Sequence, residues 1–311
     1  MVDLLAPVSM GLSRTPLVRL EALSPPGVDI FAKLEWVLPT GSIKDRIAVA
    51  MLEKARLEGL LSPETRLLEP SSGNTGIALA RLAMMWNIPF TVVMAEGASQ
   101  ERVEILKTFG TEIVYSPGDE GSNGAVRVAG EMAASGDYLM LNQYENLANV
   151  EAHYRGTGRE IVEDLDHVDA FVAGLGTGGT LMGAGTAIRE SFPQAQVVAA
   201  EPPMGELITG LRSIDAGYIP PIFDPDRIDR RILVRLAPTI EHTRTLLSVE
   251  GLFAGPSCGA ALAVALRIAR EMRSGTIVTI FPDAGWKYLS TGIYTGSIQE
   301  AVKGATNQIL W

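Results

Sequence analysis

The chain has 311 residues, of which 47% are hydrophobic and 20% charged, so it can bury a sizeable core and is long enough for two lobes. Its formal net charge of −10 argues against a nucleic-acid or anionic-membrane partner. A single cysteine, Cys258, excludes an internal disulfide, and three histidines with one cysteine offer no metal-cluster spacing. With no basic leader and no apolar run of roughly 20 residues, we expect a cytoplasmic protein.

Short β-branched and apolar runs alternate with amphipathic segments along the chain. This alternation is typical of an α/β protein with parallel sheets covered by helices. Ligands in such sheets bind at the carboxyl ends of strands, where loops lead into helices. The predicted strands are 30–35, 66–69, 90–94, 112–115, 170–173, 196–201 and 276–281, and the predicted helices are 43–58, 76–86, 100–109, 123–134, 181–190 and 260–273.

The first of four informative loops is Pro39-Thr40-Gly41-Ser42. It leads into a predicted helix, with Ser42 as the expected N-cap and Lys44 in the first turn. The positive end of the helix dipole opposes the charge of a lysine and lowers its pKa, as a Schiff-base lysine requires. On position alone, a solvated surface lysine is the simpler interpretation.

The second loop, Glu69-Pro70-Ser71-Ser72-Gly73-Asn74-Thr75-Gly76, joins a predicted strand to an apolar helix. Hydroxyls, an amide and free backbone N–H groups at a helix N-terminus suit an anion such as a substrate carboxylate. An ordinary capped turn is the alternative interpretation.

The third loop, Gly174-Leu175-Gly176-Thr177-Gly178-Gly179-Thr180, also lies between a strand and a helix. Its glycines allow close approach to a phosphate, and two threonines add donors. The loop lacks the G-x-G-x-x-G spacing of a dinucleotide site. The fourth loop, Gly255-Pro256-Ser257-Cys258-Gly259-Ala260, offers a serine that either caps its helix or faces a ligand.

In this order, TGSIKDR, SSGNTG, GLGTGGT and GPSCGA resemble the signature loops of the fold-type II pyridoxal 5′-phosphate (PLP) enzymes, whose two-lobed fold is like that of tryptophan synthase β. The resemblance extends over nearly the whole chain and is greatest to the M-type (B-type) cysteine synthases and O-phosphoserine sulfhydrylases. It implies a smaller mobile domain at 37–145 and a larger PLP-binding domain made of 1–36 and 146–311. It also implies a homodimer.

The resemblance assigns roles to residues of all four loops. Lys44 would form the Schiff base with PLP, Asn74 would bond the ring 3′-oxygen, and Ser257 would face the pyridine nitrogen. The phosphate-binding residues would be Gly176, Thr177, Gly178, Gly179 and Thr180. The substrate-carboxylate residues would be Ser71, Ser72, Gly73, Thr75 and Gln143.

The implied reaction is replacement of the β-substituent of a serine derivative by sulfur, through an α-aminoacrylate, to give L-cysteine. Arg212 stands where O-acetylserine-specific enzymes usually have small residues, and arginine grips phosphate bidentately, so O-phospho-L-serine is the expected substrate, with O-acetyl-L-serine as the alternative. The run 283–289 and the apolar terminus Ile309-Leu310-Trp311 resemble the branch that takes sulfur from a thiocarboxylated carrier protein. In that branch the tail enters the active-site cleft.

Two other functions remain open at this stage. A serine or threonine dehydratase would stop at elimination, but Gln143, within Asn-Gln-Tyr, favours the synthase. A non-catalytic regulatory paralogue is the second alternative, and the intact Lys44 with all four loops argues against it.

Overall fold

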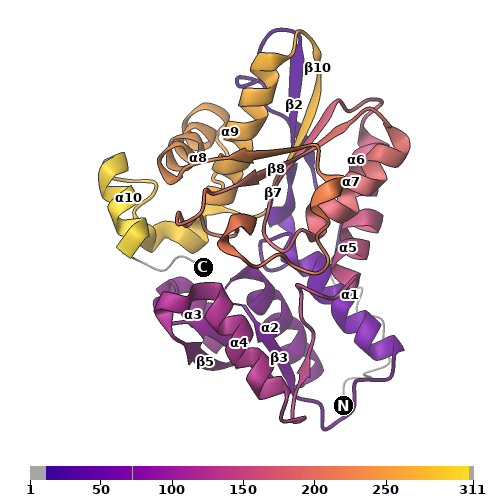
Figure 1. Cartoon of the computed structure of the whole chain (residues 1–311), viewed down its shortest axis with the longest axis vertical. Helices are drawn as coiled ribbons and strands as arrows, with labels where there is room; N and C mark the ends of the chain where they lie inside the picture. The colour runs from indigo at the N-terminus through magenta and orange to yellow at the C-terminus, as the bar shows by residue number, and fades with distance from the viewer. Residues whose placement is uncertain (1–11, 72, 308–311) are drawn as a thin grey trace.

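The structure, a computed structural model, describes residues 12–71 and 73–307. It contains one six-stranded and one four-stranded sheet, each flanked by helices, which appear in the upper and lower halves of Figure 1. The α/β class predicted from the alternating pattern is therefore confirmed. Among the described residues, no helix combines the length and apolar character needed to cross a bilayer.

The larger sheet has the strand order β1-β2-β10-β7-β8-β9, and only β1 runs antiparallel to its neighbour. Along β7, Val172 packs into the core on one face, whereas Phe171 and Ala173 pack into the core on the other. The strands are β1 (Leu17–Arg19), β2 (Val28–Leu34), β7 (Ala170–Gly174), β8 (Gln196–Glu201), β9 (Arg230–Leu233) and β10 (Gly275–Phe281).

Helices cover both faces of this sheet (Figure 1). Apolar residues of α8 and α9 belong to the core on one face, and those of α6 and α7 to the core on the other. The helices of this part are α5 (Ala148–Ala152), α6 (Arg159–Asp164), α7 (Gly179–Ser191), α8 (Leu236–Glu250), α9 (Pro256–Glu271) and α10 (Ile298–Asn307). A π-helical segment, His153–Gly158, joins α5 to α6.

The smaller sheet has the order β5-β4-β3-β6, with all neighbours parallel. Its strands are β3 (Leu67–Pro70), β4 (Phe90–Ala95), β5 (Glu112–Ser116) and β6 (Leu139–Met140). Helices α1 to α3 share a core with one face, and α4 packs on the other. These helices are α1 (Lys44–Leu57), α2 (Asn74–Trp86), α3 (Gln100–Thr108) and α4 (Gly121–Ala133).

All seven predicted strands and all six predicted helices are present, with their ends shifted by only a few residues. The short strands β1, β6 and β9 were not predicted, nor were the helices α5, α6, α8 and α10. Strand β6 has only two residues and β9 begins with two arginines, so neither shows an apolar alternation. The stretch 142–155, for which no strand or helix was predicted, contains α5 and the start of the π-helical segment.

Candidate active site

Two adjoining pockets lie where the two sheets face each other. Lys44, Asn74 and Thr177 line both pockets. The first pocket is further lined by Ser71, Gly73, Thr75, Ser122, Gln143, Tyr144 and Arg212, and the second by Gly178, Thr180, Ser257, Asp283 and Tyr288. Residues from all four predicted loops therefore meet in one place.

The carboxyl end of β10 holds two of these loops side by side. The backbone N–H of Ile43 donates to Pro282 O at 2.8 Å, and that of Gly255 donates to Asp283 O at 3.0 Å. Ile43 directly precedes Lys44, and Gly255 lies two residues before Ser257. The side chains of Lys44 and Ser257 are therefore held near Asp283.

Lys44 is the first residue of α1. The N-cap is Ile43 and not Ser42, so that prediction was wrong; Ser42 Oγ instead accepts a 3.4 Å hydrogen bond from the backbone N–H of Lys44. Burial lowers the pKa of the Lys44 amine to about 8, while the nearby Asp283 carboxylate opposes this shift. The main cause is burial, which the helix-dipole argument did not include. A lower pKa makes more of the neutral, nucleophilic amine available near neutral pH.

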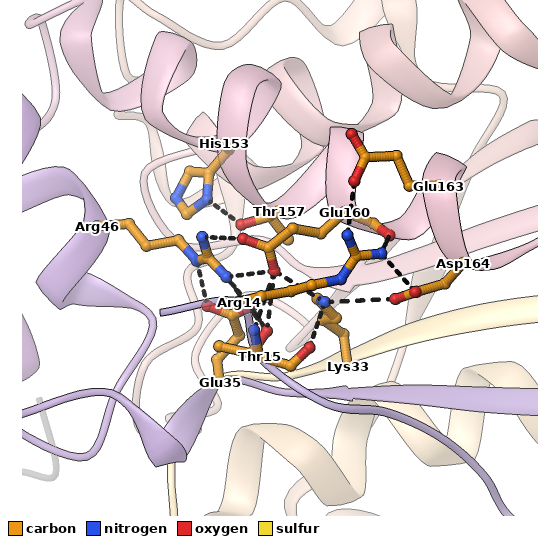
Figure 2. Close-up of polar contacts among 10 residues, drawn as sticks. All are labelled: Arg14, Thr15, Lys33, Glu35, Arg46, His153, Thr157, Glu160, Glu163 and Asp164. Atoms are coloured by element: carbon orange, nitrogen blue, oxygen red, sulfur yellow. Dashed lines mark hydrogen bonds and ion pairs between the residues drawn. The ribbon is translucent and has the colours of Figure 1, made fainter. Parts of the chain in front are cut away.

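A buried network of charges anchors the helix that carries Lys44 (Figure 2). Arg46 donates from Nε to Glu35 Oε2 at 2.7 Å and from Nη1 to Glu160 Oε1 at 2.7 Å. Lys33 Nζ lies 2.8 Å from Glu160 Oε2. Burial alone would raise the pKa of Glu160, but hydrogen bonds and charge from Arg46 and Lys33 lower it to about 2. The network thus ties α1 to β2 and α6 through ion pairs with little access to solvent.

The second predicted loop forms a polar turn at the start of α2. Ser71 Oγ accepts hydrogen bonds from the backbone N–H groups of Gly76 at 3.1 Å and Gly73 at 3.4 Å. Thr75 Oγ1 donates to Gln143 Oε1 at 2.6 Å, so two of the predicted carboxylate-binding residues contact each other. Ser72, the remaining member of this set, lies outside the described residues.

Asn74 is held from both sides of its amide group. Its Nδ2 donates to Asp283 Oδ2 at 2.8 Å, and its Oδ1 accepts from Lys287 Nζ at 2.7 Å. Since a carboxylate only accepts and an ammonium only donates, the amide has one possible orientation. Sequence reasoning missed Asp283 and Lys287 as site residues; the available signal was their position just after a buried strand.

Steric requirements explain the glycines of the third loop. Gly178 is the N-cap of α7 with φ of +87°, and a Cβ there would lie 2.6 Å from Phe223 Cβ. A Cβ on Gly176 would lie 2.9 Å from Gly210 O. Gly179 lies on neither pocket's lining but packs against Asn149. The glycine loop thus brings its backbone and the hydroxyls of Thr177 and Thr180 to the pocket.

Ser257 and Cys258 lie in the first turn of α9, where Gly255 is the N-cap. Ser257 is buried and faces the second pocket. Cys258 is fully buried, and its Sγ donates to Asp283 O at 3.3 Å. Burial raises the pKa of this thiol well above its ordinary value, so it stays protonated. This environment suits a packing residue and not a nucleophile.

The guanidinium of Arg212 lies over the rings of both Tyr144 and Tyr218, with its carbon 5.1 and 4.8 Å from the two ring centres. It also donates to Ser122 Oγ at 3.0 Å and to Asn123 Oδ1 at 3.1 Å. Because the last two residues begin α4, Arg212 connects the loops of the larger sheet to the smaller one. The sequence predicted the arginine but none of these four partners.

The residues present suit a cofactor that carries both an aldehyde and a phosphate. A half-buried, pocket-lining amine of lowered pKa, that of Lys44, can condense with an aldehyde. A glycine loop with no room for Cβ atoms, at the start of α7, can receive a phosphate. Among the described residues, no group of three or more His, Cys, Asp or Glu side chains is placed to hold a metal ion.

Comparison with known proteins agrees with this chemistry. The profile of the family described as "Pyridoxal-phosphate dependent enzyme" matches residues 8–283. The chain belongs to this family. PLP is accordingly the cofactor of this chain.

Relatives of known name narrow the position within the PLP-dependent family. A cysteine synthase from Staphylococcus aureus is 39% identical over 292 residues, which cover 90% of this chain and 94% of the relative. The crystal structure of an O-ureido-L-serine synthase is 34% identical with a TM-score of 0.86, covering 94% of this chain and 95% of that one. The crystal structure of a cysteine synthase from Entamoeba histolytica is 30% identical with a TM-score of 0.85, and the match covers 100% of this chain and 95% of that one. The chain therefore has the fold-type II architecture of the cysteine-synthase-like enzymes.

Proposed function

We propose that this protein is a cysteine synthase that replaces the β-substituent of a serine derivative with sulfur. One observation carries the proposal: the amine of Lys44, with its pKa lowered to about 8, lies in a pocket with a polar loop at the start of α2 and a glycine loop at the start of α7. This set of groups suits an amino-acid substrate and a phosphate-bearing cofactor together. Similarity to two cysteine synthases supports the same reaction class.

Bound PLP supplies an electron sink for the bond that breaks at the substrate α-carbon. The chain's own residues then orient the substrate and move its protons. Lys44 Nζ is the base placed to take the α-proton, since a pKa of about 8 lets it accept and return a proton near neutral pH. We assign the cofactor's 3′-oxygen to Asn74 and its ring nitrogen to the neutral hydroxyl of Ser257.

We assign the substrate carboxylate to the turn that opens α2. The two N–H groups that donate to Ser71 Oγ leave its hydroxyl hydrogen free for a ligand. Gln143, whose Oε1 is engaged by Thr75, retains its amide N–H groups as donors. Together with the backbone of Gly73 and with Ser72, these groups would hold the α-carboxylate and leave the β-substituent to extend towards Arg212.

We propose O-phospho-L-serine as the preferred substrate because of the surroundings of Arg212. Its present acceptors, Ser122 Oγ and Asn123 Oδ1, are neutral. A phosphate is a stronger acceptor for guanidinium than either of them, and contact with the rings of Tyr144 and Tyr218 keeps the planar group ready for bidentate binding. O-acetyl-L-serine carries a neutral acetyl substituent before elimination, so it offers this positive charge no anionic partner on binding.

Steady-state kinetics with both substrates would test this preference. Arg212→Leu is expected to raise KM for O-phosphoserine by about 10- to 100-fold, since hydrogen bonds to charged groups contribute roughly 1.5–3 kcal/mol. KM for O-acetylserine should change little. Equal losses with both substrates would contradict the assignment. Release of pyruvate without cysteine, in the presence of sulfide, would instead indicate a dehydratase.

We further propose that a sulfur-carrier protein with a thiocarboxylated C-terminus can serve as sulfur donor, with free sulfide as the alternative. The support is the resemblance of the 283–289 run; the tail, Ile309 to Trp311, lies outside the described residues. Deleting the residues after Thr306 is expected to change the preference between the two donors. An unchanged preference between carrier protein and sulfide would show that the tail has no part in the choice of donor.

We also propose that 37–145 acts as a mobile domain against 1–36 plus 146–311, and that two copies associate as a cytoplasmic homodimer. The four-stranded sheet lies entirely within the first of these segments, which supports the division. Sedimentation of the purified holoenzyme would test the dimer.

A further inference from the structure

Asn149 lies behind the active-site pocket and contacts two of its walls. It belongs to α5 and is fully buried, and it is absent from the lining of either pocket. Its Nδ2 donates to Gln143 O at 2.8 Å and to Thr177 Oγ1 at 3.0 Å. Both acceptors belong to residues that line the pocket, one on the substrate side and one on the glycine loop.

The orientation of this amide is determined by its neighbours. The carbonyl of Gln143 can only accept hydrogen bonds, so a flipped Asn149 would place two oxygens against each other. The opposite end, Oδ1, is buried and has no hydrogen-bond partner among the described residues. A Cβ on Gly179 would lie 1.9 Å from this oxygen, so the glycine at that position gives Asn149 its space.

The contact with Thr177 fixes the direction of the threonine hydroxyl. Thr177 Oγ1 accepts from Asn149 at 3.0 Å and from the backbone N–H of Gly179 at 3.4 Å. A hydroxyl has two acceptor sites and one hydrogen. With both acceptor sites used inside the protein, the remaining hydrogen is available to an acceptor in the pocket that Thr177 lines.

We propose that Asn149 is a positioning residue that makes Thr177 a hydrogen-bond donor to the cofactor phosphate and, through the same amide, holds the backbone of Gln143 in place. The inference rests on the assignment of the phosphate to the glycine loop. It adds a physical link between the cofactor-phosphate and substrate-carboxylate sides of the pocket. Asn149 itself touches neither ligand.

Two forms of the cofactor test the phosphate part. Full-length protein freed of cofactor would be titrated with PLP and with pyridoxal, which lacks the phosphate. Asn149→Ala is expected to weaken PLP binding about tenfold and pyridoxal binding less than about twofold, as for the loss of one hydrogen bond to a charged group. The phosphorus-31 resonance of the bound phosphate should shift in the same variant. Equal weakening of both ligands, or an unchanged resonance, would overturn the proposal.

A double-mutant cycle tests the route through Thr177. If Asn149 acts through that hydroxyl, Asn149→Ala combined with Thr177→Val should bind PLP no more weakly than Thr177→Val alone. Additive losses would overturn the proposal. If Thr177→Val weakens the binding of PLP and of pyridoxal equally, the assignment of the phosphate to the glycine loop itself fails, which is a separate result.

A nearby asparagine supplies the matched control. Asn146 donates from Nδ2 to a backbone carbonyl, Leu141 O at 3.0 Å, but has no bond to Thr177. Asn146→Ala should therefore leave the ratio of PLP to pyridoxal affinity unchanged. If Asn149→Ala does not fold, Asn149→Asp keeps the side-chain shape, removes both donors and should alter the same ratio.

Discussion

At the scale of single residues, Asn74 depends on partners more than 200 positions away in the chain. Lys287 and Asp283 hold opposite ends of its amide, and Lys287 Nζ also donates to Gly41 O at 3.2 Å. An amide fixed in this way presents its second Nδ2 hydrogen in one direction only. Under the proposed assignment of the 3′-oxygen of PLP to Asn74, the direction of this hydrogen bond is set by residues that do not need to touch the oxygen.

Removing the amine of Lys287 tests this arrangement. Lys287→Met would free the Asn74 amide to rotate, and we expect PLP affinity to fall about tenfold, the equivalent of roughly 1.4 kcal/mol. The pH titration of the bound cofactor's absorbance should shift as well. Lys287→Arg keeps a donor and should retain most of the affinity. Wild-type affinity and titration in Lys287→Met would show that Asn74 needs no such support.

The sequence alone allowed prediction of the residues within the four loops, because each loop has a local pattern of glycine, hydroxyl and lysine residues. It did not allow prediction of Asp283, Lys287, Tyr144 or Tyr218 as parts of the site. These residues reach the pocket through contacts between distant segments. Such contacts leave no periodicity along the chain, and the one signal for Asp283 and Lys287 was their position just after a buried strand.

At the scale of secondary-structure elements, the charge network of Figure 2 holds α1 against β2 and α6. The π-helical segment takes part, since a Cβ on Gly156 would lie 2.7 Å from Arg46 Nη1. Glycine at this position therefore leaves space for the guanidinium of Arg46. This packing restrains α1 and so fixes the position of Lys44 at its start.

Glu160→Gln tests how much the network contributes to stability. Glu160 has a folded pKa of about 2, below its ordinary 4.5, so its contribution is complete above pH 4.5 and disappears as pH falls towards 2. We expect the variant to lose roughly 3–5 kcal/mol of unfolding free energy near neutral pH, because it removes the carboxylate charge that Arg46 and Lys33 share in a site with little access to solvent. The difference in unfolding free energy between the variant and wild type should become smaller as the pH falls below 4.5.

Glu163 on the same helix provides the control for urea unfolding at each pH. It pairs with Arg14 at 2.6 Å, but its side chain is 62% exposed. Glu163→Gln should cost less than about 1 kcal/mol, as is usual for a surface pair. If the free energies of unfolding of wild type and Glu160→Gln differ by the same amount across the acidic range, the role assigned to the Glu160 charge is contradicted.

Elements with a strong internal pattern were predicted, and elements defined by their neighbours were not. Strand β8 has the predicted bounds because its apolar run is bordered by polar residues on both sides. Strand β6 exists only through pairing with β3, and α8 contains a proline and several threonines near its start. Tertiary contacts override weak local preference in such segments.

At the scale of the whole molecule, the pocket is shared by two sheets, and Arg212 is a hydrogen-bonded connection between them. The strand order within each sheet was not predicted from the pattern, since pairing partners such as β2 and β10 are far apart in the chain. The two-lobed arrangement was expected only from the resemblance of the loops.

Hydrogen exchange would test whether substrate draws the two parts together. O-Phosphoserine should slow exchange at the first turn of α4, near Ser122, because Arg212 and the bound phosphate would close over it. The same ligand should give no such protection in Arg212→Leu. Equal protection from exchange in wild type and Arg212→Leu would show that contacts other than those of Arg212 cause the closure.

The central claim is that Lys44 is the residue that holds PLP. Borohydride reduction of the holoenzyme makes a lysine–PLP bond permanent, and peptide mass spectrometry then identifies the lysine. Two amines lie in this pocket region, the half-buried Lys44 on its lining and the buried Lys287 behind Asn74. We predict the added pyridoxyl mass on the peptide containing Lys44 alone; finding it on Lys287, or on no lysine, would contradict the account.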